Sequence, residues 1–143
     1  MTTLRDLKDL HAITNARYAQ RQQSFARLVE REAQIRAELQ RVDDMDRASR
    51  ATGTDVIPMR AIGADVIWHG WMGRTRAALN AELAQVLAIK AQHLKEVQRT
   101  YGKLMVVEEM QRNLKDQLKR DAHTAELDRA IDLSVTRRAD PAQ

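Results

Sequence analysis

Cysteine is absent from the chain, and aromatic residues, glycine and proline are scarce. The lack of cysteine excludes disulfides, thiolate catalysis and zinc sites built on cysteine. Aromatic residues make up 3% of the sequence, and there are only five Gly and two Pro residues. Thick globular cores rely on aromatic side chains, because each of them buries a large area. The sequence therefore predicts a thin apolar seam between long helices, which suits its abundance of Ala, Leu, Arg, Gln and Glu.

Long hydrophobic runs are also missing. No stretch approaches the roughly 20 apolar residues that a membrane-spanning helix needs, and charged residues follow the first methionine closely. A signal peptide would instead show an apolar segment near the start. We therefore expect a cytoplasmic protein, which would reach the inner face of the membrane only through its partners.

Signatures of the common enzyme classes are absent as well. The sequence contains no P-loop, no GxGxxG, no HExxH and no GxSxG. The four histidines are far apart and share no metal-ligand spacing with carboxylates, and we interpret His11 and His93 as half-buried helix residues. We therefore predict a protein that is not an enzyme and that has no catalytic residue, cofactor or metal.

The first half of the chain carries a long helical pattern. Thr3 is expected to cap a helix, with Asp6 three positions later accepting from the first-turn amides. Apolar residues then recur at alternating spacings of three and four, and no Gly or Pro interrupts them before Gly53. This seam pattern is typical of a coiled coil. Its positions are Leu4, Leu7, His11, Thr14, Tyr18, Arg21, Phe25, Leu28, Glu32, Ile35, Leu39 and Val42.

A chain reversal is predicted after this helix. Residues 52–58, Thr-Gly-Thr-Asp-Val-Ile-Pro, combine Gly for positive φ, Asp for capping and Pro for a helix start. A second seam pattern follows, at Leu79, Leu83, Val86, Val97, Leu104, Val107, Leu114 and Leu118. We predict one all-α coiled-coil hairpin over residues 1–143, with a helix over about 3–48, a turn over about 49–60, a longer antiparallel helix over about 61–137 and a frayed tail over 138–143.

The unequal arms leave part of the second helix without a partner. Reversal about residue 55 would set Leu4 opposite roughly residue 106, so about 30 residues would extend beyond the first helix. A phase slip near Asp121 is expected to let Leu127 and Ile131 continue the stripe, as a stutter does. This extension is expected to expose Leu114, Leu118, Leu127 and Ile131. Exposed apolar residues of this kind call for burial against another protein or another copy, or leave the segment partly disordered. Gly102 is interpreted as a close approach of the two helices or a bend.

Charge and tryptophan mark two further candidate surfaces. Residues 74–104 hold six basic and two acidic residues, whereas the flanking parts are balanced. This stripe suits an acidic protein partner, although it also fits a solvated face. Trp68 and Trp71 lie three positions apart, so they share a helix face. They either form a partner hot spot or close the hairpin mouth against Ile62, Met59 or Val42.

The sequence resembles the FliJ/YscO family of type III secretion proteins over nearly its whole length. The resemblance rests on its size, on the opening Thr3-Leu4-Arg5-Asp6-Leu7, on an Arg/Gln/Ala-rich first helix, and on the run from Trp71 to Gly102 with Arg74-Thr75-Arg76-Ala77-Ala78-Leu79-Asn80 and Ala91-Gln92-His93. The resemblance implies an antiparallel coiled coil similar to the paired terminal helices of the rotary ATP synthase γ subunit. It further implies a stalk that contacts the hexameric export ATPase, the export gate and export chaperones.

We therefore predict a non-enzymatic stalk or adaptor of a type III export apparatus, with flagellar export as the expected system. Its partner-binding residues are predicted to be Trp68, Trp71, Arg74, Arg76, Lys90, Lys95, Arg99, Lys103, Arg112, Leu114, Leu118, Lys119, Leu127, Arg129 and Ile131. The alternative is a scaffold that covers its exposed seam by self-association. A coiled coil associated with nucleic acid is a third hypothesis, but the mixed charge of both arms argues against it.

Overall fold

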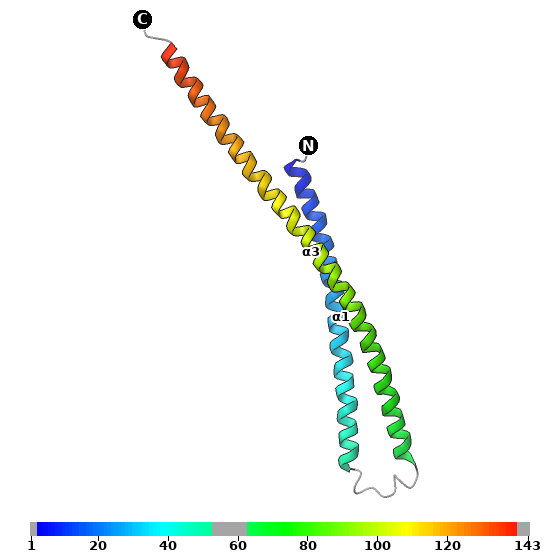
Figure 1. Ribbon diagram of the computed structural model, residues 1–143. Coiled ribbons are helices and arrows are strands. Elements are labelled where there is room, and N and C mark those ends of the chain that lie inside the picture. Colours follow the sequence, from blue (N-terminus) through cyan, green and yellow to red (C-terminus); the bar gives the residue numbers. More distant parts are fainter. Residues whose placement is uncertain (1–2, 53–62, 140–143) are drawn as a thin grey trace. The chain divides into compact units, whose positions relative to one another are not determined.

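A computed structural model describes residues 3–52 and 63–139 of the chain (Figure 1). Two helices account for nearly all of them: α1 spans Leu4–Thr52 and α3 spans Ala64–Ala139. The helices pack against each other as an antiparallel hairpin in which the second helix is the longer, so the predicted fold class is confirmed. No strand occurs among the described residues. None of their helical segments is both long and apolar enough to span a bilayer.

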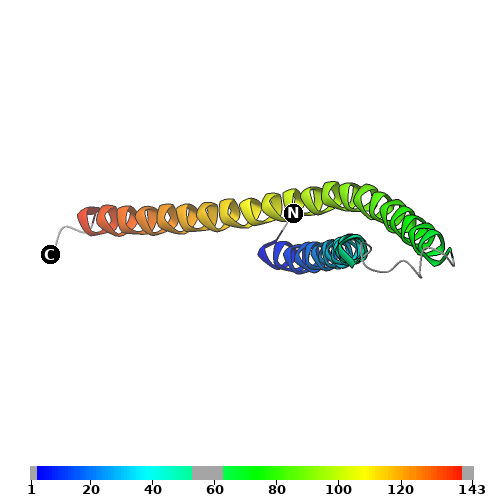
Figure 2. The same cartoon turned by 90° about the horizontal axis from the view of Figure 1, so that it is seen from below.

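The chain divides into two units. One unit covers Ala19–Gln98, and we call it the middle unit. The other joins Met1–Tyr18 with Arg99–Gln143, and we call it the terminal unit. In each of them a stretch of α1 lies beside a stretch of α3, running in opposite directions (Figures 1 and 2).

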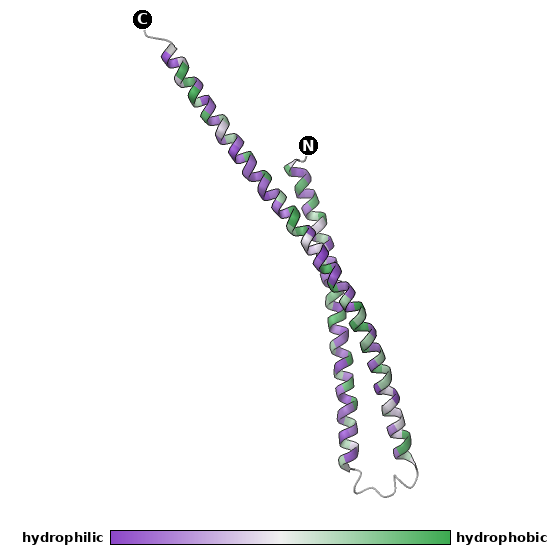
Figure 3. Ribbon diagram, in the orientation of Figure 1, coloured by the Kyte–Doolittle hydropathy of each residue, from purple (hydrophilic) through white to green (hydrophobic). Residues whose placement is uncertain are grey.

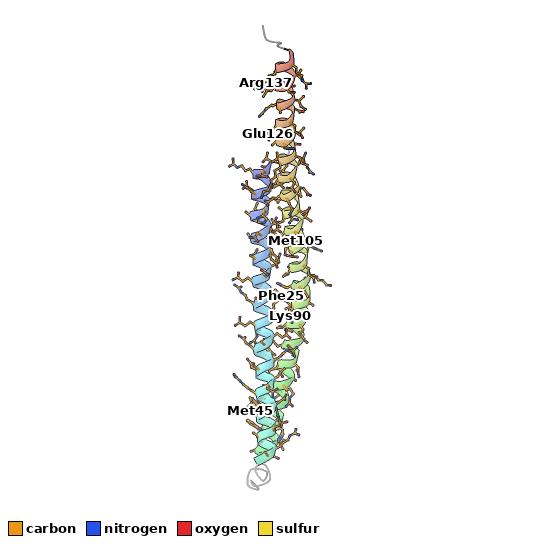
Figure 4. The ribbon with its side chains drawn as sticks, turned by 90° about the vertical axis from the view of Figure 1, so that its left-hand side faces the viewer. Phe25, Met45, Lys90, Met105, Glu126 and Arg137 are labelled. Carbon is orange, nitrogen blue, oxygen red and sulfur yellow. The ribbon has the colours of Figure 1, made fainter. Side chains whose placement is uncertain are left out.

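The seam of the middle unit is thin and apolar. Ile35 is fully buried and Met72 is 2% exposed, while Val42 and Val86 are also buried. Leu28 and Leu39 are half-buried at the spacings expected from the sequence, whereas Arg21 is largely exposed. Phe25 and Lys90 lie along this contact between the helices (Figure 4). The three-four repeat therefore identifies the buried side of α1 correctly.

The terminal unit continues the same type of seam. Its buried residues are Leu7, Thr14, Leu104 and Val107. The rings of Tyr18 and Tyr101 meet across it with their centroids 5.5 Å apart. Thr14 is a buried polar residue, and its hydroxyl is satisfied by donating to the backbone oxygen of Leu10 at 2.6 Å.

Local sequence signals define the first turn of each helix. The backbone N–H of Asp6 donates to Thr3 Oγ1 at 3.1 Å, and that of Thr3 donates to Asp6 Oδ2 at 2.8 Å. This reciprocal pair is a capping box, so Thr3 is the N-cap as predicted. α3 starts just after Gly63, whose φ of 73° suits a residue without a side chain. The carbonyl of Gly63 accepts the N–H of Ile67 at 3.3 Å, in the first turn of that helix.

The helix bounds and the register differ from the sequence-based expectation. α1 continues to Thr52, and Asp46 and Ser49 extend its seam as half-buried residues, so the expected turn over 49–60 begins too early. α3 starts at Ala64 rather than near residue 61, and residues 53–62, including Gly53, Asp55 and Pro58, lie outside the described part.

The register follows from contacts in the terminal unit. His11 Nε2 lies 3.4 Å from Glu108 Oε1, and Gln111 Nε2 donates to the backbone oxygen of Leu7 at 2.8 Å. Continuing this pairing sets Leu4 near Leu114, not near residue 106 as expected. The expectation assumed equal pairing about residue 55, whereas the contacts of the terminal unit pair α1 with residues about eight positions further along α3.

Candidate partner-binding surface

The stretch of α3 beyond Leu114 has no residue of α1 beside it in the terminal unit. All described side chains from residue 115 to residue 138 are exposed. We call residues 115–138 the overhang. It contains Glu126 and Arg137, which lie along the part of α3 that runs on past the start of α1 (Figure 4). Hydrophobic positions recur along it among hydrophilic ones (Figure 3).

Apolar side chains of the overhang are open to solvent. Leu118, Leu127 and Ile131 are 50%, 51% and 57% exposed, as the sequence predicted. Leu114 is half-buried, so the expectation that the extension of α3 exposes it is wrong, because Leu114 still lies near the first turn of α1. Sequence reasoning missed Leu133 and Val135, which are 65% and 59% exposed. The spacing of four between Ile131 and Val135 was the available signal.

These apolar residues occupy two sides of the helix. Leu118 and Leu127 are nine positions apart in a continuous helix. At about 100° per residue they point in opposite directions. Leu118 continues the line of the seam, whereas Leu127, Ile131 and Val135 form a line on the other side. The expected continuation of one stripe through a phase slip is therefore wrong, and the overhang is apolar on two sides.

The predicted cations of the overhang region differ in their contacts. Arg112 Nη1 pairs with Glu109 Oε2 at 2.7 Å, one turn earlier in α3. Lys119 and Arg129 are exposed and take part in no ion pair among the described residues. The latter two therefore remain available to acidic groups of another molecule.

The basic stripe of residues 74–104 is partly used within the hairpin. Arg76 Nη2 lies 2.8 Å from Asp43 Oδ1 and 3.8 Å from Asp46 Oδ2. Lys90 forms an ion pair with Glu32. These two basic residues therefore connect the helices of the middle unit. The exposed cations of the stripe that form no ion pair within residues 3–51 and 63–138 are Arg74, Lys95, Arg99 and Lys103.

The tryptophans form a third cluster, at the start of α3. Trp68 and Trp71 stack on each other with ring centroids 5.3 Å apart, and 36% and 43% of their surfaces are exposed. Beside them in sequence, Val66 and Ile67 are each 71% exposed. Packing of the tryptophans on Met59 or Ile62 falls outside the described residues. The exposed stack has the composition of an interface hot spot.

The described residues form no cluster of metal ligands. No group of three or more His, Asp or Glu side chains in residues 3–51 and 63–138 could hold a metal ion. No family model, no curated protein and no solved structure matches the chain. The candidate site is therefore a set of three surfaces: the overhang, the cations without an ion pair and the tryptophan cluster.

Proposed function

We propose that the protein is a stalk or adaptor in a type III protein export apparatus, where it contacts the hexameric export ATPase, the export gate and export chaperones. One observation carries the proposal: α3 extends beyond the first residue of α1 as a helix with exposed leucine and isoleucine on two sides. Contact of apolar side chains with water is unfavourable, so we expect the overhang to bind a partner protein that buries these side chains.

A ring-shaped host suits the overhang better than a flat one. Apolar residues on opposite sides of one helix are both covered only by a binding site that encloses it. A hexameric ATPase has a central opening that can surround a helix. Lys119 and Arg129 would then contact acidic loops of the ring. The tryptophan cluster would bind the export gate.

The test is a binding and ATPase experiment with the export ATPase of the same source. We expect the whole chain to bind the hexamer and to increase ATP hydrolysis. Leu127→Glu and Ile131→Glu should weaken binding at least tenfold, because each places a charge on an apolar contact. Gln92→Glu is the matched control, since Gln92 is an exposed residue of α3 outside the overhang. Absence of binding and of ATPase stimulation would rule out this function.

Self-association is the alternative occupant of the overhang. The range 115–138 contains six basic and five acidic residues, so two copies would not repel strongly. Light scattering distinguishes the two hypotheses. A dimer that persists on dilution and does not bind the ATPase would favour the scaffold role over the export role.

A further inference from the structure

The middle unit has a second apolar line on α3, beside the seam and facing solvent. A small or apolar residue directly follows each of four seam residues of α3, which are Leu83, Val86, Lys90 and His93. These followers keep the alternating spacing of four and three, but they lie about 100° further round the helix. All are exposed, with Leu87 at 37% and Leu94 at 43%. The line consists of Ala84, Leu87, Ala91 and Leu94.

α1 carries the corresponding line. Ala26, Val29 and Ala33 directly follow the seam residues Phe25, Leu28 and Glu32, and all three are exposed. In an antiparallel helix pair, the positions that follow the seam on both helices lie on the same side of the pair. Val29 and the α3 line therefore lie on one exposed side of the helix pair, along the line where the two helices meet, and we call this side the follower groove.

Ion pairs distinguish the two sides of the pair over residues 21–33 and 82–96. Arg31 precedes the seam residue Glu32, Glu82 precedes Leu83, and the two form an ion pair across the helices. Arg21 Nη1 and Glu96 Oε2 add a second bridge at 2.8 Å, and Glu96 also precedes a seam residue. Along this stretch the side that precedes the seam is therefore bridged by charge, whereas the follower groove is lined by Ala, Val and Leu. Further along the pair the follower side has a bridge as well, from Arg76 to Asp43, which follows the seam residue Val42.

We propose that the follower groove binds an amphipathic α-helix of a partner protein, with acidic residues beside its apolar stripe. The alternating spacing of the two lines indicates that the ligand is a helix. Apolar side chains spaced three and four positions apart on an incoming helix would insert between residues of the groove that have the same spacing. Alanines at every second position of each line let a third helix approach closely. The groove continues the established seam and turns the pair into a local three-helix arrangement.

The charge near the groove specifies the acidic character of the partner. Arg36 follows the buried seam residue Ile35, and 57% of its side chain is exposed although it pairs with Glu32. Lys95 directly follows Leu94, is exposed and forms no ion pair among the described residues. Glu30 is the acidic residue beside Val29, so the surroundings of the groove carry a net positive charge. Glutamates or aspartates on the flanks of the incoming helix complement this charge.

The experiment selects helical peptides that bind to the whole protein. A displayed library of 21-residue helices carries Leu at alternating spacings of three and four, and its flanking positions are randomised. We expect helices with acidic flanks to be enriched, and Leu94→Glu or Leu87→Glu to weaken their binding at least tenfold. Gln92→Glu is the matched control, because it adds the same charge on an exposed position of α3 off the line; it should change binding less than twofold.

Folding and self-association are measured on the same variants. Circular dichroism should give the same helicity and the same Tm for Leu94→Glu and Gln92→Glu, since both sites are exposed. Failure to enrich any helix, or equal binding to Leu94→Glu, would overturn the proposal. Dimers in light scattering that Leu94→Glu abolishes would assign the groove to a second copy instead. None of these results depends on the export ATPase, so this inference and the proposed function can fail separately.

Discussion

Lys90 and Glu32 form an ion pair inside the seam of the middle unit. Lys90 Nζ donates to one carboxylate oxygen of Glu32, and Arg36 Nε donates to the other at 2.9 Å. The side chains of Glu32 and Lys90 are only 14% and 29% exposed. The hydrogen bond from Lys90, followed by that from Arg36, holds the pKa of Glu32 below its ordinary value, although burial acts in the opposite sense.

Replacing one member of this pair is expected to destabilise the hairpin. Glu32→Leu leaves the Lys90 ammonium in the seam without its acceptor, and Lys90→Leu leaves the carboxylate with Arg36 alone. Each single variant should lower Tm by a few degrees. The double variant should regain most or all of the wild-type Tm, because two leucines fill the seam without a charge to desolvate. Thermal melts of the four proteins measure the coupling, and strictly additive effects would contradict it.

Stability should decrease in acid. A carboxyl group whose pKa is lower in the folded state stabilises the fold above its ordinary pKa, and this contribution disappears as the pH falls through the folded-state pKa. Glu32 behaves in this way, and so does Asp6, whose pKa is lowered by the backbone and then the side-chain hydrogen bond with Thr3. We expect Tm to fall between about pH 6 and pH 3. Glu32→Gln should show a smaller fall, and an unchanged pH profile would refute this role.

Truncation of the fully buried seam residue is expected to cost more than truncation in the overhang. Ile35 is 0% exposed, and Ile131 is 57% exposed. Ile35→Ala should destabilise the protein by about 2 kcal/mol, near the lower end for core truncations because a thin seam can relax around the cavity. Ile131→Ala removes the same atoms from an exposed site and should change stability by less than about 0.5 kcal/mol. Urea denaturation followed by circular dichroism checks both, and similar losses would indicate that Ile131 is covered within the molecule.

Gly102→Ala is expected to stabilise the hairpin. A methyl group built at Gly102 meets no atom within 4 Å, so the interpretation of this glycine as a close approach of the helices is wrong. Alanine favours a helix interior by about 1 kcal/mol over glycine. The variant should therefore raise the free energy of unfolding by about 0.5–1 kcal/mol. A loss of stability in the same denaturation experiment would reveal a strain that the described residues do not account for.

The fold class and the buried side of α1 could be read from the sequence because both depend on local periodicity. A three-four repeat from Leu4 to Val42 fixes which side of a helix is apolar, whatever that side packs against. The cap at Thr3 was also predictable, because its hydrogen bonds reach only to Asp6. The exposed Trp68 and Leu127 were found as candidates from their spacing and from the longer second helix.

The tertiary structure alone decided the register of the two helices. Sliding one helix by about two turns keeps apolar positions opposite apolar positions, so the pattern does not distinguish a pairing of Leu4 with roughly residue 106 from one near Leu114. The register in turn decided that Lys90 and Arg76 bind Glu32 and Asp43, while Lys95 faces solvent. Which side of the pair is bridged by charge beside the follower groove is likewise a property of two helices together, because it depends on residues far apart in the sequence.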